Sequence, residues 1–151
     1  MKKILAAVMI IGTVLLTGCG AEKEKTMKCS RTINQAAIKM NLTYNVTYKG
    51  DYVSKIESNE KITTEDESTL ELYKTQLENS TASFKDIEHY DHEVKIDGNT
   101  LTSTITIDYE KIDTDKLIEI DSSMKQLIKD GKISVENIES LYSKLGVTCE
   151  K

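Results

Sequence analysis

In the segment KMNLTYNVTY, residues 39–48, apolar and polar side chains alternate without a break. This is the pattern of a β-strand with one buried side. A turn signal, Lys-Gly-Asp at 49–51, follows, and residues 52–62 return with a less regular alternation. The pattern predicts a β-hairpin over residues 39–62. The side chains on its buried face are Met40, Leu42, Tyr44, Val46 and Tyr48.

A helix and a second hairpin are predicted next. Thr64 is expected to cap the helix, with Glu67 completing a capping box, and Leu70, Tyr73 and Leu77 recur at helical spacing. The second hairpin turns at residues 97–99, Asp-Gly-Asn. On its outgoing strand, residues 101–109 place mainly apolar side chains on one face and polar ones on the other.

The last forty residues are predicted to be helical. One helix is expected over residues 116–130, with a break near residues 121–123, and it ends at Gly131. Ser134 is expected to cap a final helix, and Gly146 suits the position just after its end. The fold class is therefore α+β: an antiparallel sheet built from two β-hairpins with helices packed on one face, in the order ββαββ and then C-terminal helices.

The N-terminus is typical of a bacterial lipoprotein signal peptide. Lys2 and Lys3 form a basic start, and residues 4–16 form an apolar segment too short for an ordinary membrane-spanning helix. Leu-Thr-Gly-Cys at 16–19 resembles a lipobox. We therefore expect cleavage between Gly18 and Cys19, with lipidation of the Cys19 thiol. A secretory signal with an incidental cysteine is the alternative.

The predicted organisation has three parts. Residues 1–18 are the signal peptide, residues 19–28 are the lipidated cysteine with a flexible tether, and residues 29–151 are a single α+β domain. The chain of 151 residues is 38% apolar and has a formal net charge of −5. Because it carries no basic block that could neutralise phosphates, we expect no nucleic-acid partner.

Two cysteines remain once Cys19 is assigned to the lipid. Cys29 and Cys149 bracket the domain, in a compartment that permits oxidation. A disulfide between them is the favoured interpretation. Two free thiols or a metal pair are the alternatives, and the metal pair is weak without supporting histidines nearby.

Candidate catalytic and metal-binding residues are scarce. The only histidines are His89 and His92, and strand parity from Val94 and Ile96 turns His92 inward and His89 outward. That separation disfavours a metal site, so no metal or other cofactor is expected. No Gly-x-Ser-x-Gly, phosphate-loop or His-Glu-x-x-His motif occurs in the sequence. An enzyme is therefore disfavoured.

Three tyrosines are candidates to face a ligand: Tyr44, Tyr48 and Tyr109. An aromatic ring with a polar tip can hold a ligand at the edge of a cleft. The alternative is that these residues take the place of Phe in the core, since the chain has one Phe and no Trp.

A family resemblance rests on the order of several short motifs. These are the lipobox, Cys29-Ser30, residues 48–51 (YKGD), residues 55–58 (KIES), the run 94–109, and the closing residues 146–149 (GVTC). Together they resemble the YehR-like family of small bacterial lipoproteins, over residues 29–151. The resemblance implies one α+β domain on a lipid anchor with the two domain cysteines paired. That family has no characterised function, so it supplies no catalytic residue.

The expected function is that of a non-catalytic binding module. The protein is expected on the extracytoplasmic face of the cell membrane, attached through its lipid, with a small ligand or an envelope protein as partner. A structural or assembly accessory to another envelope protein is the alternative. A small envelope enzyme ranks third.

Overall fold

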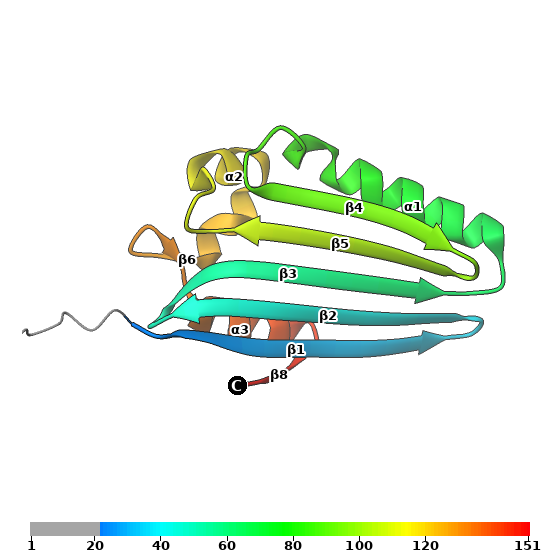
Figure 1. The fold of residues 1–151 in the computed structure, drawn as a ribbon, viewed down its shortest axis with the longest axis horizontal. Coiled ribbons are helices and arrows are strands. Elements are labelled where there is room, and N and C mark those ends of the chain that lie inside the picture. Colours follow the sequence, from blue (N-terminus) through cyan, green and yellow to red (C-terminus); the bar gives the residue numbers. More distant parts are fainter. Residues whose placement is uncertain (1–21) are drawn as a thin grey trace, which may run out of the picture.

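Six strands form one antiparallel sheet in the order β4-β5-β3-β2-β1-β8 (Figure 1). This computed structural model describes residues 22–151. The predicted signal peptide, cleavage site and lipidation of Cys19 lie outside the described residues. The strands are β1 (Glu24–Gln35), β2 (Ile38–Lys49), β3 (Tyr52–Thr63), β4 (Tyr90–Asp97), β5 (Thr100–Asp108) and β8 (Thr148–Glu150).

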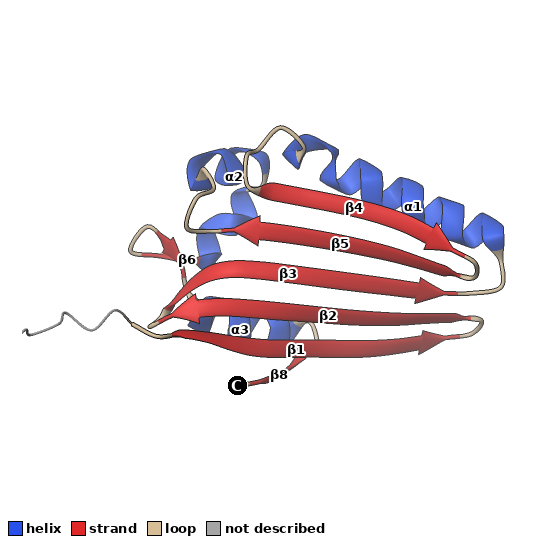
Figure 2. Cartoon of the chain, viewed as in Figure 1, coloured by secondary structure: helices blue, strands red, loops and turns tan. Residues whose placement is uncertain are grey.

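The predicted α+β class and both predicted hairpins are confirmed. The β2–β3 pair and the β4–β5 pair have the expected turns, and β3 also pairs with β5. In β2 the side chains predicted to be buried lie on the face that the helices cover. Figure 2 shows the helices behind the sheet and the open face toward the viewer.

Strand β1 is the largest addition to the predicted sheet. It pairs with β2 along its whole length and begins at Glu24, so the prediction of a flexible tether is wrong for residues 24–28. Only Met27 and Cys29 are fully buried in this strand; on the same face, Arg31 is exposed and Ile33 is half-buried. Because the remaining side chains are exposed, the alternation in the sequence is too weak to indicate a strand.

Helix α1 (Glu67–Thr81) covers the half of the sheet that lies toward β4. Its Leu70 packs against Ile62 and Leu101 in a core cluster. The predicted cap at Thr64 is wrong: Asp66 is the N-cap, and its carboxylate accepts hydrogen bonds from the backbone of Ser68 and Thr69. Because Asp66 lies two residues nearer to the helix than Thr64, its carboxylate can reach the first free amides of α1 directly. A short 3-10 helix, η1 (Ala82–Phe84), follows the C-terminal end of α1.

The C-terminal segments cover the other half of the sheet. The predicted break near residue 121 is confirmed, because α2 (Thr114–Ile120) ends there and the 3-10 helix η2 (Ser122–Leu127) follows. Residues 128–130 are not helical as predicted. They belong instead to a small hairpin of β6 (Ile128–Lys129) and β7 (Lys132–Ile133). Helix α3 (Val135–Lys144) begins after its N-cap Ser134, as predicted.

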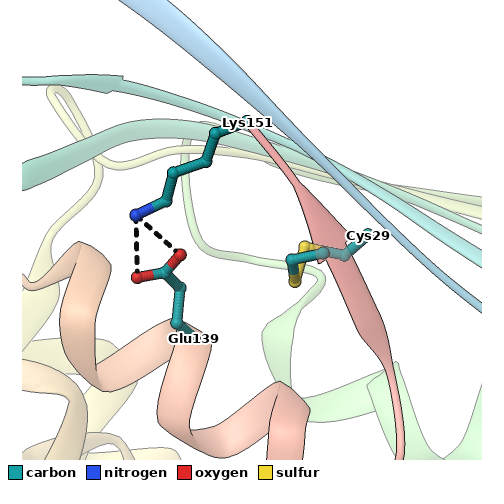
Figure 3. The surroundings of a disulfide bond; sticks show 4 residues. Cys29, Glu139 and Lys151 are labelled. Atoms are coloured by element: carbon teal, nitrogen blue, oxygen red, sulfur yellow. Dashed lines mark hydrogen bonds and ion pairs between the residues drawn. A yellow bond between two sulfur atoms is a disulfide. The ribbon is translucent and has the colours of Figure 1, made fainter.

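The end of the chain returns to the sheet edge. Gly146, at φ +70°, reverses the backbone after α3, and strand β8 then pairs with β1. Cys29 and Cys149 face each other in this pair and form a disulfide with an S–S distance of 2.07 Å (Figure 3). Beside it, Lys151 and Glu139 form an ion pair of 2.9 Å. On the chain-entropy model, closing a loop of this length stabilises the fold by on the order of 4–5 kcal/mol.

The core consists of three adjoining clusters rather than one. The largest joins α3 to β1, β2 and β3 through Met27, Val46 and Ile138, among others. The second lies under α1, and the third holds Ile87, Ile112 and Leu117 between α2 and the end of β5. Among residues 22–151, no helix has the length and apolar character needed to cross a membrane.

Candidate functional site

A cavity of about 690 Å³ opens at the end of the sheet where β1 begins. Its floor is formed by Val53, Ser54, Tyr109 and Ile112, and Tyr52 and Thr114 lie beside them. Its charged rim is formed by Glu22, Lys49, Glu110 and Lys132. We call this cavity the turn pocket, because the β2–β3 turn lies on its edge. Figure 1 shows that turn and the β6–β7 hairpin at the same end of the sheet. The volume is within the range usual for small-molecule sites.

An extra residue in β3 shapes the floor of the turn pocket. Thr47 pairs with Lys55 and Tyr48 pairs with Val53, so Ser54 has no partner across the β2–β3 ladder. Such a bulge bends a strand and re-aims its side chains. The Ser54 carbonyl accepts a hydrogen bond of 2.8 Å from the amide of Tyr109, which joins the two strand ends that line the floor.

The start of α3 fixes the other side of the turn pocket. The amide of Val135 donates to the carbonyl of Asp51 at 3.0 Å, and Tyr52 forms an isolated β-bridge with Ser134. The β2–β3 turn is thereby held against the segment that carries the β6–β7 hairpin. Lys132, on β7, reaches the rim in this way.

Ser54 is the most unusual group in the pocket wall. Its side chain is 6% exposed, and its hydroxyl has no hydrogen-bond partner among residues 22–151. It is the only buried side-chain polar atom in that part of the chain left without a partner. An unsatisfied buried hydroxyl costs about 1–3 kcal/mol, so a native structure retains one only for a reason.

Tyr109 lies in the floor beside Ser54 and also packs against two of the core clusters. Burial, with a smaller contribution from Tyr90, raises the pKa of the Tyr109 phenol far above its ordinary value. Like any tyrosine at neutral pH, the phenol is protonated and can donate a hydrogen bond.

The rim combines both signs of charge. Lys49 Nζ lies 2.8 Å from a carboxylate oxygen of Glu110 and 3.8 Å from one of Glu24. The hydrogen bond to Glu110 is the main reason that the pKa of Lys49 is raised. Lys132 Nζ stands 5.2 Å from the centre of the Tyr52 ring, and the Tyr52 hydroxyl donates to Asp130 at 3.0 Å. That hydrogen bond raises the pKa of the Tyr52 phenol.

The structure separates the three tyrosines proposed to face a ligand. Tyr109 lines the turn pocket. Tyr48 is 8% exposed and packs in the main core, so for this residue the alternative of a core role is correct. Tyr44 packs on Tyr142, with ring centres 4.6 Å apart, and borders a smaller cavity of about 190 Å³ under the helices. The three residues therefore do not form one site.

Sequence reasoning missed the other residues of the turn pocket. Glu22, Ser54 and Lys132 come from three separate segments, and no spacing in the sequence relates them. The sequence did contain one signal of the pocket. Apolar and polar residues alternate regularly in β2, but the alternation in β3 is interrupted at Val53-Ser54-Lys55. That irregularity is the bulge.

His92 lies away from the turn pocket, between α1 and the sheet. Its Nδ1 is 2.7 Å from the Thr81 hydroxyl, and its Nε2 is 2.9 Å from the Ser103 hydroxyl. Thr81 donates to the carbonyl of Leu77, so it accepts from Nδ1–H and leaves Nε2 to accept from Ser103. The inward position of His92 matches the predicted strand parity, whereas His89 is an exposed residue in the turn before β4, at φ +70°.

The His92–Ser103 pair looks like part of a catalytic dyad but lacks a place for an oxyanion. Ser103 lies in the middle of β5 and is paired on one side with Glu60 and on the other with Val94. The amides around it are therefore engaged in the sheet and cannot stabilise a developing negative charge. The pair instead ties the C-terminal end of α1 to β4 and β5. Residues 22–151 contain no cluster of three or more metal-ligating side chains.

Comparison with known proteins identifies the class. The structure is a small α+β domain with one face of a six-stranded sheet open and a pocket at one end. Residues 26–148 match the family described as "Protein of unknown function (DUF1307)", and the chain belongs to this family. No curated protein matches the chain.

Two solved structures share the fold. One is the NMR structure of the E. coli YehR protein, with a TM-score of 0.59 and 26% sequence identity, covering 86% of this chain and 93% of that one. The predicted resemblance to the YehR-like family is thus confirmed. The other is the NMR structure of a protein from Streptococcus pneumoniae TIGR4, with a TM-score of 0.53 and 16% identity over 99% of this chain and 96% of that one.

Protonation of His92 should weaken the fold. Burial lowers its pKa below the ordinary 6.5, and Glu78 only partly opposes this effect. The unfolded chain therefore binds a proton more readily, so the free energy of unfolding should fall as the pH drops through about 6.5 and level off below the folded-state pKa. Urea denaturation at pH 7.5 and 5.5 measures this loss. It should shrink in His92→Gln and persist in the exposed control His89→Gln. An equal loss in His92→Gln and the wild type would contradict this role for His92.

Proposed function

We propose that this protein is a bacterial lipoprotein of the cell envelope that binds a small ligand in the turn pocket and catalyses no reaction. The observation that carries the binding half of this proposal is the turn pocket itself, a cavity of about 690 Å³ with four charged residues on its rim; Ser54, whose hydroxyl is buried without a partner, lies in its wall. The lipobox carries the anchoring half. Anchoring would place the domain on the extracytoplasmic face of the cell membrane.

The anchor is supported by four agreeing sequence features. A basic start, a short apolar segment, small residues at positions 17 and 18, and Cys19 follow one another at the spacing of a lipoprotein signal. Two or three acyl chains hold a protein on a bilayer far more firmly than one, at about 0.8 kcal/mol for each buried CH₂ group.

Ligand binding is supported by the residues of the floor. The buried Ser54 hydroxyl lacks a partner, and Tyr109 lies in the same wall. Val53 and Ile112 add apolar surface beside them. The lining thus combines some apolar surface with polar and charged groups that could orient a small molecule.

The alternatives draw less support from the described residues. A catalytic role for Ser103 and His92 would need an oxyanion site that the sheet ladder does not offer. An assembly accessory would present a contiguous apolar surface. The large exposed apolar side chains, Leu72, Ile120 and Leu145, instead belong to three different helical segments.

The anchor predicts a specific covalent change. Protein purified from the membranes of the native bacterium should lack residues 1–18 and carry acyl chains on Cys19, as shown by intact mass and by the N-terminal peptide. Cys19→Ala should lose the acyl mass. The matched control, Cys29→Ala with Cys149→Ala, should keep it. A wild-type protein with an unmodified Cys19 would contradict the anchor.

The incomplete pocket predicts opposite effects of two serine substitutions. In ligand-free protein, Ser54→Ala should raise the free energy of unfolding by about 1 kcal/mol, because it removes an unsatisfied hydroxyl. Ser103→Ala, at an equally buried serine that bonds His92, should lower it by a similar amount. Chemical denaturation measures both. A loss of stability in Ser54→Ala would show that its hydroxyl is already satisfied and would count against the pocket as a ligand site.

A further inference from the structure

Two of the four rim charges of the turn pocket neutralise each other. The Lys49 ammonium and the Glu110 carboxylate lie 2.8 Å apart, and Glu24 adds a weaker contact to the same lysine. A ligand that used either group would have to compete with this pair. Lys49 and Glu110 are therefore best regarded as a part of the wall.

The other two rim charges, Glu22 and Lys132, have opposite signs. Neither forms an ion pair within 4.0 Å in the part of the chain that the structure describes. Glu22 is placed by the β2–β3 turn: its carboxylate occupies the position where a side chain at Gly50 would begin. Lys132 is placed by the Tyr52 ring, over which its ammonium stands. Both charges are thus positioned at the pocket and remain available.

We propose that the turn pocket binds a small zwitterion, whose ammonium group pairs with Glu22 and whose carboxylate or phosphate group pairs with Lys132. This inference rests on the proposed function, since it names the ligand class of the same pocket. A molecule with both charges satisfies both side chains at once. Charge-assisted hydrogen bonds of this kind are roughly twice as strong as neutral ones.

The neighbouring charges disfavour a ligand with only one sign. Asp51 and Asp130 lie close enough to Tyr52 to raise the pKa of its phenol, together with Glu22. This excess of carboxylates would repel a purely anionic ligand. A purely cationic ligand would leave Lys132 without a counter-charge. It would also approach the ammonium group of Lys49 on the same rim. A zwitterion avoids both penalties.

Two sources of such a ligand exist at the proposed location. One is a free amino acid, whose side chain could contact Val53 and Ile112. The other is the phosphoethanolamine headgroup of a membrane lipid. Glu22 follows the proposed lipidation site, Cys19, by three residues, which span at most about 11 Å. Both sources share the ammonium-plus-anion chemistry, so the experiment has to separate them.

Calorimetric titration of the full-length mature lipoprotein in a nonionic detergent tests the inference. The zwitterionic probes are glycerophosphoethanolamine and the amino acids glycine, alanine, leucine and phenylalanine. The single-charge controls are ethanolamine and leucinamide, which carry only the ammonium, and glycerol 3-phosphate and 4-methylpentanoate, which carry only the anion. At least one zwitterion should bind with a Kd at least tenfold lower than both of its single-charge relatives. The probe that binds then identifies the source.

Charge-removing variants assign the site. Glu22→Gln and Lys132→Met, both at exposed positions, should each weaken binding of that zwitterion at least fivefold. The control pair Glu93→Gln and Lys95→Met, an exposed ion pair of 2.6 Å on β4, should leave the Kd unchanged.

Several results would overturn the inference. Single-charge relatives that bind as tightly as the zwitterions would refute the ligand class while leaving the pocket as a binding site. Binding that is unaffected by Glu22→Gln and Lys132→Met would refute the location. If no probe binds, the zwitterion is refuted, and the proposed function is then judged separately by the stability of Ser54→Ala.

Discussion

The pairing of β2 with β3, including its one extra residue, determines where the helices pack and where the turn pocket forms. Regular alternation in β2 creates a covered face on which α1 and α3 can pack and an open face of polar side chains. The bulge at Ser54 changes the course of β3 beside Tyr109. The turn between the strands then receives the start of α3 through Asp51. The turn pocket is the space bordered by these elements.

The parts of the fold that local chemistry determines could be predicted from the sequence. In four places, residues close together in the sequence determine the backbone conformation. These are the alternation in β2, the Asp-Gly-Asn turn, the Ser134 cap and the left-handed Gly146. Strand β1 could not be predicted, because pairing with β2, rather than its own apolar pattern, makes it a strand. The helix cap was misplaced for a related reason: Thr64 and Asp66 are both good capping residues, and only the path of the chain selects between them.

The candidate site was largely hidden from the sequence because its groups meet only in the tertiary structure. Tyr109 was identified from the sequence as a candidate to face a ligand. The other residues were not: Glu22 lies just before β1, Ser54 in the bulge of β3, and Lys132 in the two-residue strand β7. None of these positions has a motif. Their common location is the turn pocket, at the end of the sheet where β1 begins. The proposed lipid anchor at Cys19, three residues before Glu22, would hold the domain at the end where the turn pocket opens.

Paramagnetic NMR on the lipidated protein in lipid nanodiscs tests this claim most directly, with a spin label on the lipid headgroups. Strands of twelve residues separate the two ends of the sheet by roughly 35–40 Å. The amide signals of Gly50 and Gly131, beside the turn pocket, should be strongly attenuated. Those of Ala36 and Gly98, in the turns at the far end, should remain. Equal or stronger attenuation of Ala36 and Gly98 would contradict a pocket that opens toward the membrane.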